Sequence, residues 1–200
     1  KCKTDSVMDF DDILLYMNIL LRDFPEVTSE LRSQISHILV DEYQDTNMAQ
    51  YHIVKKIAQE SRNITVVGDD SQSIYAFRGA RIQNILNFKK DYPEAKEFRL
   101  EQNYRSTQMI VNAANSVIVH NSNRLKKDCF SEGEIGEKIG LLRSFNEVEE
   151  AAAVVNSITK RIFATKCSYD SFTVLYRTNS QSRVIEEALR RRNIPYKIFA

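Results

Sequence analysis

The sequence predicts an α/β fold in which parallel strands are joined by crossover helices. Two short apolar runs, Ile38–Val40 and Ile64–Val67, are each followed by acidic residues. The stretch between them has helical periodicity, so strand and helix alternate along the chain. An uninterrupted apolar run is typical of a strand that is buried on both faces within a parallel sheet. We therefore expect a parallel pair with a helix packed against it.

Apolar residues at three- and four-residue spacing predict several helices. In order, these span residues 9–24, 28–34, 47–60, 82–88, 106–121, 146–163 and 180–192. Pro25 is expected to follow the last turn of the first helix, and Thr28 or Ser29 to cap the second. The expected N-terminal caps of later helices are Asn47, Ser106 and Asn146.

Further strands are expected where shorter apolar runs recur between the helices. They lie at residues 97–100, 139–143, 172–176 and 195–199. The polar stretch 131–138 reads as an exposed loop. Two α/β units are predicted to meet near residues 92–100, and we assign residues 1–95 to the first domain and 96–200 to the second.

Composition narrows the class of protein only partly. A hydrophobic content of 42% with 28% charged residues is ordinary for a globular chain. The net charge of +1 requires any nucleic-acid binding to come from a local patch. The three scattered cysteines favour a reducing, cytoplasmic setting. No membrane-spanning apolar run or signal peptide is visible, and the absence of an initiator Met indicates a piece of a longer protein.

Asp41 and Glu42 follow the first apolar run directly. The carboxyl ends of parallel strands are where open α/β folds bind ligands. There, the first carboxylate can hold a divalent metal and the second can orient or deprotonate a water, as in the Walker B arrangement of nucleotide hydrolases. The alternative is a strand followed by a polar turn, and this motif taken alone favours that alternative.

The segment 68–80 follows the second apolar run and combines carboxylates, an amide, two aromatics and an arginine. In an extended loop, Tyr75 and Phe77 point the same way and can stack unpaired bases. Arg78 can meet a phosphate. The alternative is that both rings pack into the core beneath the loop.

Tyr104 and Arg105 stand at the start of a predicted helix. Because the helix dipole disfavours cations there, an arginine at this place indicates an anionic partner such as phosphate. The alternative is a surface ion pair with Glu101.

The three segments in this order resemble the UvrD/Rep-like superfamily 1 DNA helicases. The counterparts of helicase motifs II, III and IV are residues 40–47, 68–80 and 100–107. The likeness extends from residues 9–12, through 175–183, to 194–196. It covers nearly the whole chain and implies parts of two RecA-like P-loop NTPase motor domains.

The resemblance also implies roles for individual residues. Asp41 would bind the Mg²⁺ of MgATP, and Glu42 would position and activate the attacking water. Gln72 would sense the γ-phosphate and link it to the DNA-binding loop. Tyr104 would stack near the adenine, and Arg105 would contact the γ-phosphate from the second domain as an arginine finger.

For the nucleic acid, the resemblance implies that Tyr75, Phe77 and Arg78 contact single-stranded DNA. The family usually has Trp in place of Phe77. Stacking on bases should therefore persist, with a lower affinity for DNA. The implied activity is ATP-dependent 3′-to-5′ DNA unwinding at single strands and duplex junctions, in DNA repair or replication, without a membrane.

The sequence lacks the phosphate-binding Gly-x-x-x-x-Gly-Lys-Ser/Thr loop that the family carries. The chain is therefore expected to be an internal fragment that hydrolyses little or no ATP alone. Alternatives are the helicase part of a helicase-nuclease, or a non-motor DNA-binding or scaffold protein derived from a helicase. The joint presence of Asp41, Glu42, Gln72 and Arg105 argues against the scaffold.

Overall fold

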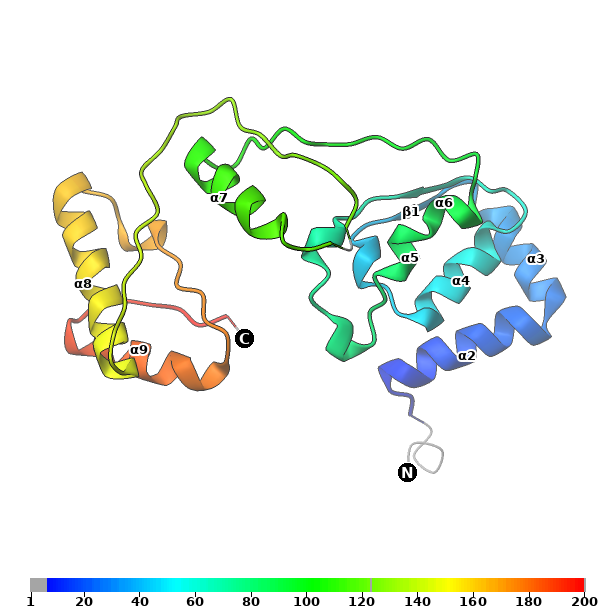
Figure 1. Ribbon diagram of the computed structural model, residues 1–200. Helices are drawn as coiled ribbons and strands as arrows, with labels where there is room; N and C mark the ends of the chain where they lie inside the picture. Colours follow the sequence, from blue (N-terminus) through cyan, green and yellow to red (C-terminus); the bar gives the residue numbers. More distant parts are fainter. Residues whose placement is uncertain (1–6, 123, 200) are drawn as a thin grey trace. The chain divides into compact units, whose positions relative to one another are not determined.

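The structure is a computed structural model that describes residues 7–122 and 124–199 (Figure 1). Its contacts form two compact units, Lys1–Glu137 and Lys138–Ala200. The division of the chain into motor-domain parts at residues 95 and 96 concerns the family's domains and stays a prediction. Within the described residues, no helix combines the length and the apolar character needed to cross a bilayer.

The first unit contains a small parallel sheet and the helices around it. Its elements are α2 (Phe10–Asp23), α3 (Pro25–Gln34), β1 (Ile38–Val40), α4 (Met48–Ala58), β2 (Ile64–Val66), α5 (Gln83–Leu86), α6 (Phe88–Asp91) and α7 (Gln108–Ile118). Three 3-10 turns lie between them, at Tyr43–Asp45, Asp70–Gln72 and Ala76–Arg78.

The β1–α4–β2 unit confirms the predicted parallel pair with a crossover helix. Ile38 pairs with Ile64 and Val40 with Val66 in parallel register. Asn47 caps α4 as predicted, because its side chain accepts a hydrogen bond from the Gln50 backbone N–H at 2.9 Å. Helix α4 in turn packs against α2 and α3.

The expectation that β1 is buried on both faces is wrong for one face. Ile38 and Val40 are half-buried, whereas the side chain of Leu39 is 76% exposed. Among the described residues the sheet has two strands, and β2 presents the polar Thr65 beside Leu39. The strand therefore buries only the face that carries Ile38 and Val40.

Two predicted helix starts are wrong. Helix α3 begins at Pro25, which occupies the first turn where its missing N–H costs nothing. Thr28, one of the expected caps, is instead buried and donates its hydroxyl to the Leu21 carbonyl at 3.0 Å.

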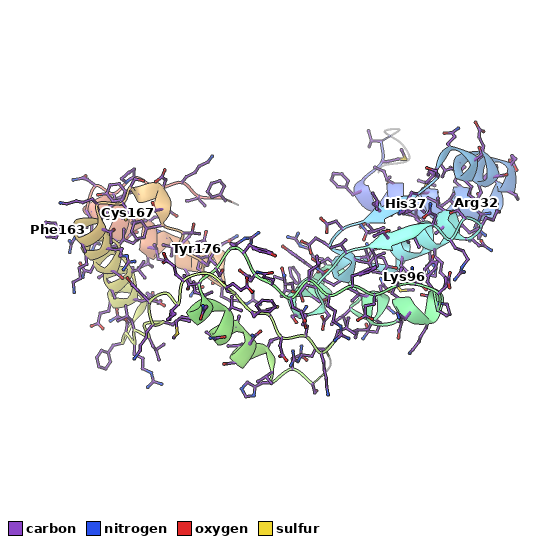
Figure 2. All side chains as sticks on the ribbon, turned by 90° about the horizontal axis from the view of Figure 1, so that it is seen from above. Arg32, His37, Lys96, Phe163, Cys167 and Tyr176 are labelled. Carbon is purple, nitrogen blue, oxygen red and sulfur yellow. The ribbon has the colours of Figure 1, made fainter. Side chains whose placement is uncertain are left out.

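Arg32 of α3 donates to the Lys56 carbonyl near the end of α4, which ties these helices together (Figure 2).

Helix α7 starts after Thr107 rather than Ser106, and no side chain caps it. The backbone N–H groups of Gln108 and Met109 donate to the carbonyls of Glu134 and Ile135, each at 3.0 Å. The loop 131–138, predicted to be exposed, is exposed in the structure. Its carbonyl groups also accept hydrogen bonds from backbone N–H groups in the first turn of α7, which have no partner within the helix.

The second unit is a pair of packed helices, α8 (Glu147–Thr165) and α9 (Asn179–Arg191), with a 3-10 turn at Tyr169–Ser171. Asn146 caps α8 as predicted, accepting from the Glu149 N–H at 2.9 Å. The core of the unit consists of Val155, Ile158, Leu189 and Ile194.

The four later strands expected from the sequence do not form ladders in the described residues. Phe172 and Val174 pack against the α8–α9 core, whereas Leu175, which follows Val174, is exposed. This alternation is typical of a strand with one buried face. A strand also needs a hydrogen-bonding neighbour, and the described backbone offers none here. Near residues 97–100 the pairing is limited to an isolated bridge between Gln102 and Phe130.

Candidate functional site

Asp41 and Glu42 lie at the carboxyl end of β1, and both side chains are exposed. Glu42 has φ 48° and ψ 43°, a left-handed conformation that costs a residue with a Cβ about 1–3 kcal/mol. The Asp41 Oδ1 accepts from the Glu42 backbone N–H at 2.9 Å, which supports this turn. Backbone strain of this kind is concentrated at functional sites.

Gln44 connects the two strand ends. Its side chain is 1% exposed, and its Nε2 donates to the Glu42 carboxylate at 2.6 Å. Its Oε1 accepts from the Asp69 backbone N–H, just after β2, at 3.0 Å. A buried amide with both ends satisfied is a rigid spacer, so Gln44 fixes Glu42 relative to the loop after β2.

Gly68 is the residue that permits this close approach. A Cβ placed there would lie 2.5 Å from the Gln44 Oε1 and 3.2 Å from the Tyr43 backbone nitrogen. Any side chain at residue 68 would therefore displace the buried amide.

Gln72 lies in the 3-10 turn after β2, and its side chain is exposed. Its Nε2 donates to the Asp69 Oδ2 at 2.9 Å. Glu42, Gln44, Asp69 and Gln72 are thus joined by consecutive hydrogen bonds. The structure brings together two of the predicted site residues, Glu42 and Gln72, through two residues that were not predicted.

Tyr75 directly precedes the 3-10 turn Ala76–Arg78 and Phe77 lies within it, so the extended loop expected from the sequence is not formed. Their ring centroids are nevertheless 6.0 Å apart, with planes inclined by 35°. The Arg78 guanidinium carbon lies 5.5 Å from each ring centroid. Phe77 is 78% exposed, so the alternative in which it packs into the core is wrong.

Tyr104 and Arg105 are both exposed and precede α7. The Asn103 Oδ1 accepts from the backbone N–H groups of Arg105 and Ser106 at 2.9 and 2.8 Å, a turn that presents both side chains. The Tyr104 hydroxyl donates to the Gln102 Oε1 at 2.7 Å. Among the described residues, Arg105 forms no ion pair with Glu101, which was the alternative expected from the sequence. The Glu101 carboxylate accepts a hydrogen bond from the Asp128 backbone N–H.

Asp41 suits a magnesium ion that is held mainly by phosphates and water. Mg²⁺ commonly takes only one or two protein carboxylates together with substrate phosphates. One Asp41 oxygen is engaged by the Glu42 N–H, which leaves the other available. The described residues contain no cluster of three or more ligands for an all-protein metal site.

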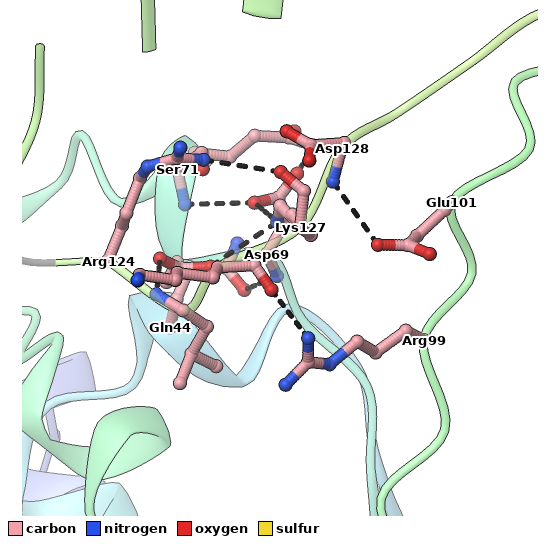
Figure 3. Close-up of polar contacts among 12 residues, drawn as sticks. Gln44, Asp69, Ser71, Arg99, Glu101, Arg124, Lys127 and Asp128 are labelled. Carbon is pink, nitrogen blue, oxygen red and sulfur yellow. Dashed lines mark hydrogen bonds and ion pairs between the residues drawn. The ribbon is translucent and has the colours of Figure 1, made fainter. Parts of the chain in front are cut away.

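Asp69, Gln44 and Lys127 are the residues of this region that sequence reasoning missed as site residues. Lys127 forms an ion pair with Asp69 and lies 3.3 Å from the Asp70 Oδ1 (Figure 3). Two features of the sequence could have indicated them: the polar run after β1, and a small basic cluster formed by Arg124, Lys126 and Lys127.

The fold and the acidic strand end are typical of α/β nucleotide hydrolases. The sequence model described as the UvrD/REP helicase N-terminal domain matches residues 1–93, and that of the UvrD-like helicase C-terminal domain matches residues 98–200. The chain belongs to the UvrD-like helicase family. The domains of this family are RecA-like P-loop α/β folds, which confirms the predicted fold class.

Curated relatives agree with this family. An ATP-dependent DNA helicase PcrA of Leuconostoc citreum is 47% identical over 196 residues, which are 98% of this chain and 26% of the relative. Proteins of the same name from Staphylococcus epidermidis and Staphylococcus aureus are 48% identical over 192 residues, 96% of the chain and 26% of each relative. The chain therefore spans about a quarter of the length of these relatives.

Proposed function

We propose that this chain is part of an ATP-dependent DNA helicase that couples ATP hydrolysis to 3′-to-5′ movement along single-stranded DNA and to duplex unwinding, in DNA repair or replication. The motor-domain parts divide near residue 95. The free Cys129 and Cys167 suit a reducing, cytoplasmic setting. Residues 1–200 alone hydrolyse little or no ATP, because they lack a phosphate-binding glycine loop.

The observation that carries this proposal is the strained Glu42 and its buried tether. Glu42 adopts a left-handed backbone next to Asp41, and Gln44 joins its carboxylate to the loop that bears Gln72, Tyr75 and Phe77. A carboxylate fixed in this way suits the orientation of a water for phosphoryl transfer, where positioning supplies most of the catalysis.

The residues divide the work between nucleotide and DNA. Asp41 would hold the Mg²⁺ that neutralises charge on the transferred phosphoryl group, and Glu42 would take up the proton of the attacking water. Tyr104 would stack on the adenine, and Arg105 would contact the γ-phosphate. Phe77 and Tyr75 would stack on bases while Arg78 meets the DNA backbone. Gln72 lies in the sequence between Glu42 and Tyr75 and bonds to Asp69, and it would connect nucleotide and DNA.

The test compares four preparations: the full-length protein, its Glu42→Gln variant, residues 1–200 alone, and residues 1–200 with Glu42→Gln. ATP hydrolysis is measured with and without single-stranded DNA, and unwinding is measured on a duplex with a 3′ single-stranded tail and on one with a 5′ tail. The proposal is supported if the full-length wild type, and none of the other preparations, shows DNA-stimulated hydrolysis and unwinds the 3′-tailed duplex. A wild type without DNA-stimulated hydrolysis, or residues 1–200 that hydrolyse ATP in a Glu42-dependent way, would contradict it.

Gln72→Ala should uncouple the two activities. A hydrogen bond to a charged group is worth about 1.5–3 kcal/mol, so DNA stimulation of ATP hydrolysis should fall about tenfold or more. DNA affinity should remain within about twofold, because the aromatic pair is intact. Steady-state hydrolysis and fluorescence anisotropy of labelled DNA measure the two effects. Gln34→Ala, an exposed glutamine at the end of α3, is the matched control. Full stimulation in Gln72→Ala would refute the coupling role.

Phe77→Ala should weaken binding to single-stranded DNA, because stacking on an aromatic ring is worth about 1–3 kcal/mol per base. Phe77→Trp should strengthen binding, since the larger ring covers more of a base. Both variants should fold normally because Phe77 is exposed. Phe163→Ala removes an equally exposed ring on α8 and serves as the control (Figure 2). Titrations at one fixed salt concentration decide the matter, and equal affinities for Phe77→Ala and wild type would exclude stacking.

A further inference from the structure

Asp69 gathers three donors at the carboxyl end of β2 (Figure 3). Its Oδ1 accepts from the Ser71 backbone N–H at 2.8 Å, and its Oδ2 accepts from the Gln72 Nε2 at 2.9 Å. The third donor is the Lys127 ammonium, which forms an ion pair with the Oδ1. Asp69 is therefore the common anchor of the Gln72 amide and of a cation far along the chain.

The neighbouring Asp70 is held by the same distant segment, residues 124–130. Its side chain is 2% exposed. The Leu125 backbone N–H donates to its Oδ2 at 2.8 Å, and the Lys127 Nζ lies 3.3 Å from its Oδ1. A buried carboxylate requires such partners, so the segment 124–130 is docked on the turn that carries Gln72.

The charges of this cluster support each other. Burial disfavours the ammonium of Lys127, but its hydrogen bond to Asp69 and the charges of Asp69 and Asp70 outweigh burial and raise its pKa. Burial likewise opposes ionisation of Asp69, but its bonds to Lys127, Gln72 and the Ser71 N–H lower its pKa. Lysine and carboxylate are therefore both charged at neutral pH.

The segment that contains Lys127 also reaches the turn of Arg105. The Asn103 N–H donates to the Phe130 carbonyl at 2.7 Å, and the Phe130 N–H donates to the Glu101 carbonyl at 3.0 Å. The Asn103 side chain then holds the Arg105 backbone at 2.9 Å. A continuous set of contacts thus runs from the Gln72 amide through Asp69 and Lys127 toward Arg105.

We propose that Lys127 is a positioning residue, which fixes the Asp69 carboxylate and through it the Gln72 amide, and ties both to the segment that presents Arg105. This inference rests on the proposed function. Without the ammonium, Asp69 keeps only the Gln72 amide and the Ser71 backbone N–H as donors. The carboxylate to which Gln72 is bonded is then no longer held in place by Lys127. Small misplacements of groups in a phosphoryl-transfer site have large effects on rate.

The variants for the test are made in the full-length protein. Lys127→Met removes the charge at similar length, and Lys127→Arg keeps the charge. Asp70→Asn combined with Lys127→Met relieves the buried Asp70 charge but leaves Asp69 without its cation. Lys126→Met is the matched control, because the Lys126 side chain is exposed and only its carbonyl oxygen accepts a bond, from Arg99 at 2.7 Å.

Two measurements are made on each variant. Hydrogen exchange followed by mass spectrometry reports the order of residues 68–80 without nucleotide. Steady-state kinetics with saturating DNA reports kcat and the KM for ATP. Lys127→Met should speed exchange in this loop and lower kcat about tenfold with KM within about twofold. Lys127→Arg should restore most of both, and Lys126→Met should match the wild type.

The double variant separates positioning from folding. It should regain thermal stability relative to Lys127→Met but keep the low kcat, because Asp69 still lacks its cation. Recovery of kcat together with stability would reduce Lys127 to a structural role and overturn the inference, as would unchanged exchange or unchanged kcat in Lys127→Met. A wild type without DNA-stimulated hydrolysis would instead refute the proposed function, and with it the role of Lys127 in that reaction.

Discussion

Glu42→Gln in the full-length protein should lower kcat for DNA-stimulated ATP hydrolysis by about 10²–10⁴-fold, the usual contribution of a positioned general base. The neutral amide cannot take up the proton of the attacking water. ATP binding should persist, because Asp41 is unchanged. A carboxamide oxygen can still accept the hydrogen bond from Gln44, so the buried tether between the strand ends remains.

The kinetic measurement pairs this variant with Glu94→Gln. Glu94 is an exposed carboxylate that forms a surface ion pair with Arg62, and such pairs contribute little. Rates are taken under single-turnover conditions, and binding of a fluorescent ATP analogue is measured separately. A Glu42→Gln variant within about threefold of the wild-type rate would exclude Glu42 as the base. Loss of nucleotide binding alone would give it a different role.

The parts of the fold that were predictable depend on local signals. Asn47 followed by Gln50 is a capping pattern that needs only a few neighbouring residues, and α4 begins there. The apolar periods of α2, α8 and α9 likewise show through the sequence. Strand formation at residues 172–176 depends on a hydrogen-bonding neighbour elsewhere in the chain, so apolar alternation there gave a strand-like face without a ladder.

The site divides in the same way. The exposed Glu42 could be proposed from its position directly after an apolar run, whereas Gln72 was proposed from the resemblance to the helicase family. Gln44 could not, because its role arises from burial between two loops that are distant in sequence. Lys127 was visible only as a member of a basic cluster, and its partners Asp69 and Asp70 are more than 50 residues away. Tertiary contacts assign such residues, and local patterns do not.

Arg105→Ala should lower kcat for ATP hydrolysis about 10³–10⁵-fold, as removal of an arginine finger does in phosphoryl transfer. The guanidinium is exposed and has no side-chain partner among the described contacts. It also stands near the N-terminus of α7, where the helix dipole disfavours a cation. Stability should therefore stay within about 0.5 kcal/mol of wild type. A large loss of rate without a loss of stability would indicate that Arg105 acts on the bound nucleotide and not on the fold.

Arg105→Lys tests what the guanidinium supplies beyond charge. A lysine is a point charge on a flexible stem and cannot form the planar, two-pronged contact with phosphate oxygens, so rescue should be small. Arg22→Ala, which removes an exposed arginine paired with Asp23 on α2, is the control and should leave kcat unchanged. Steady-state hydrolysis and thermal melts are measured together for all three variants. A wild-type rate in Arg105→Ala would remove it from the site, whereas a large fall in melting temperature would attribute the loss to folding. A rate loss with an unchanged melt would support a contact between Arg105 and the nucleotide, because no described interaction of the side chain is lost.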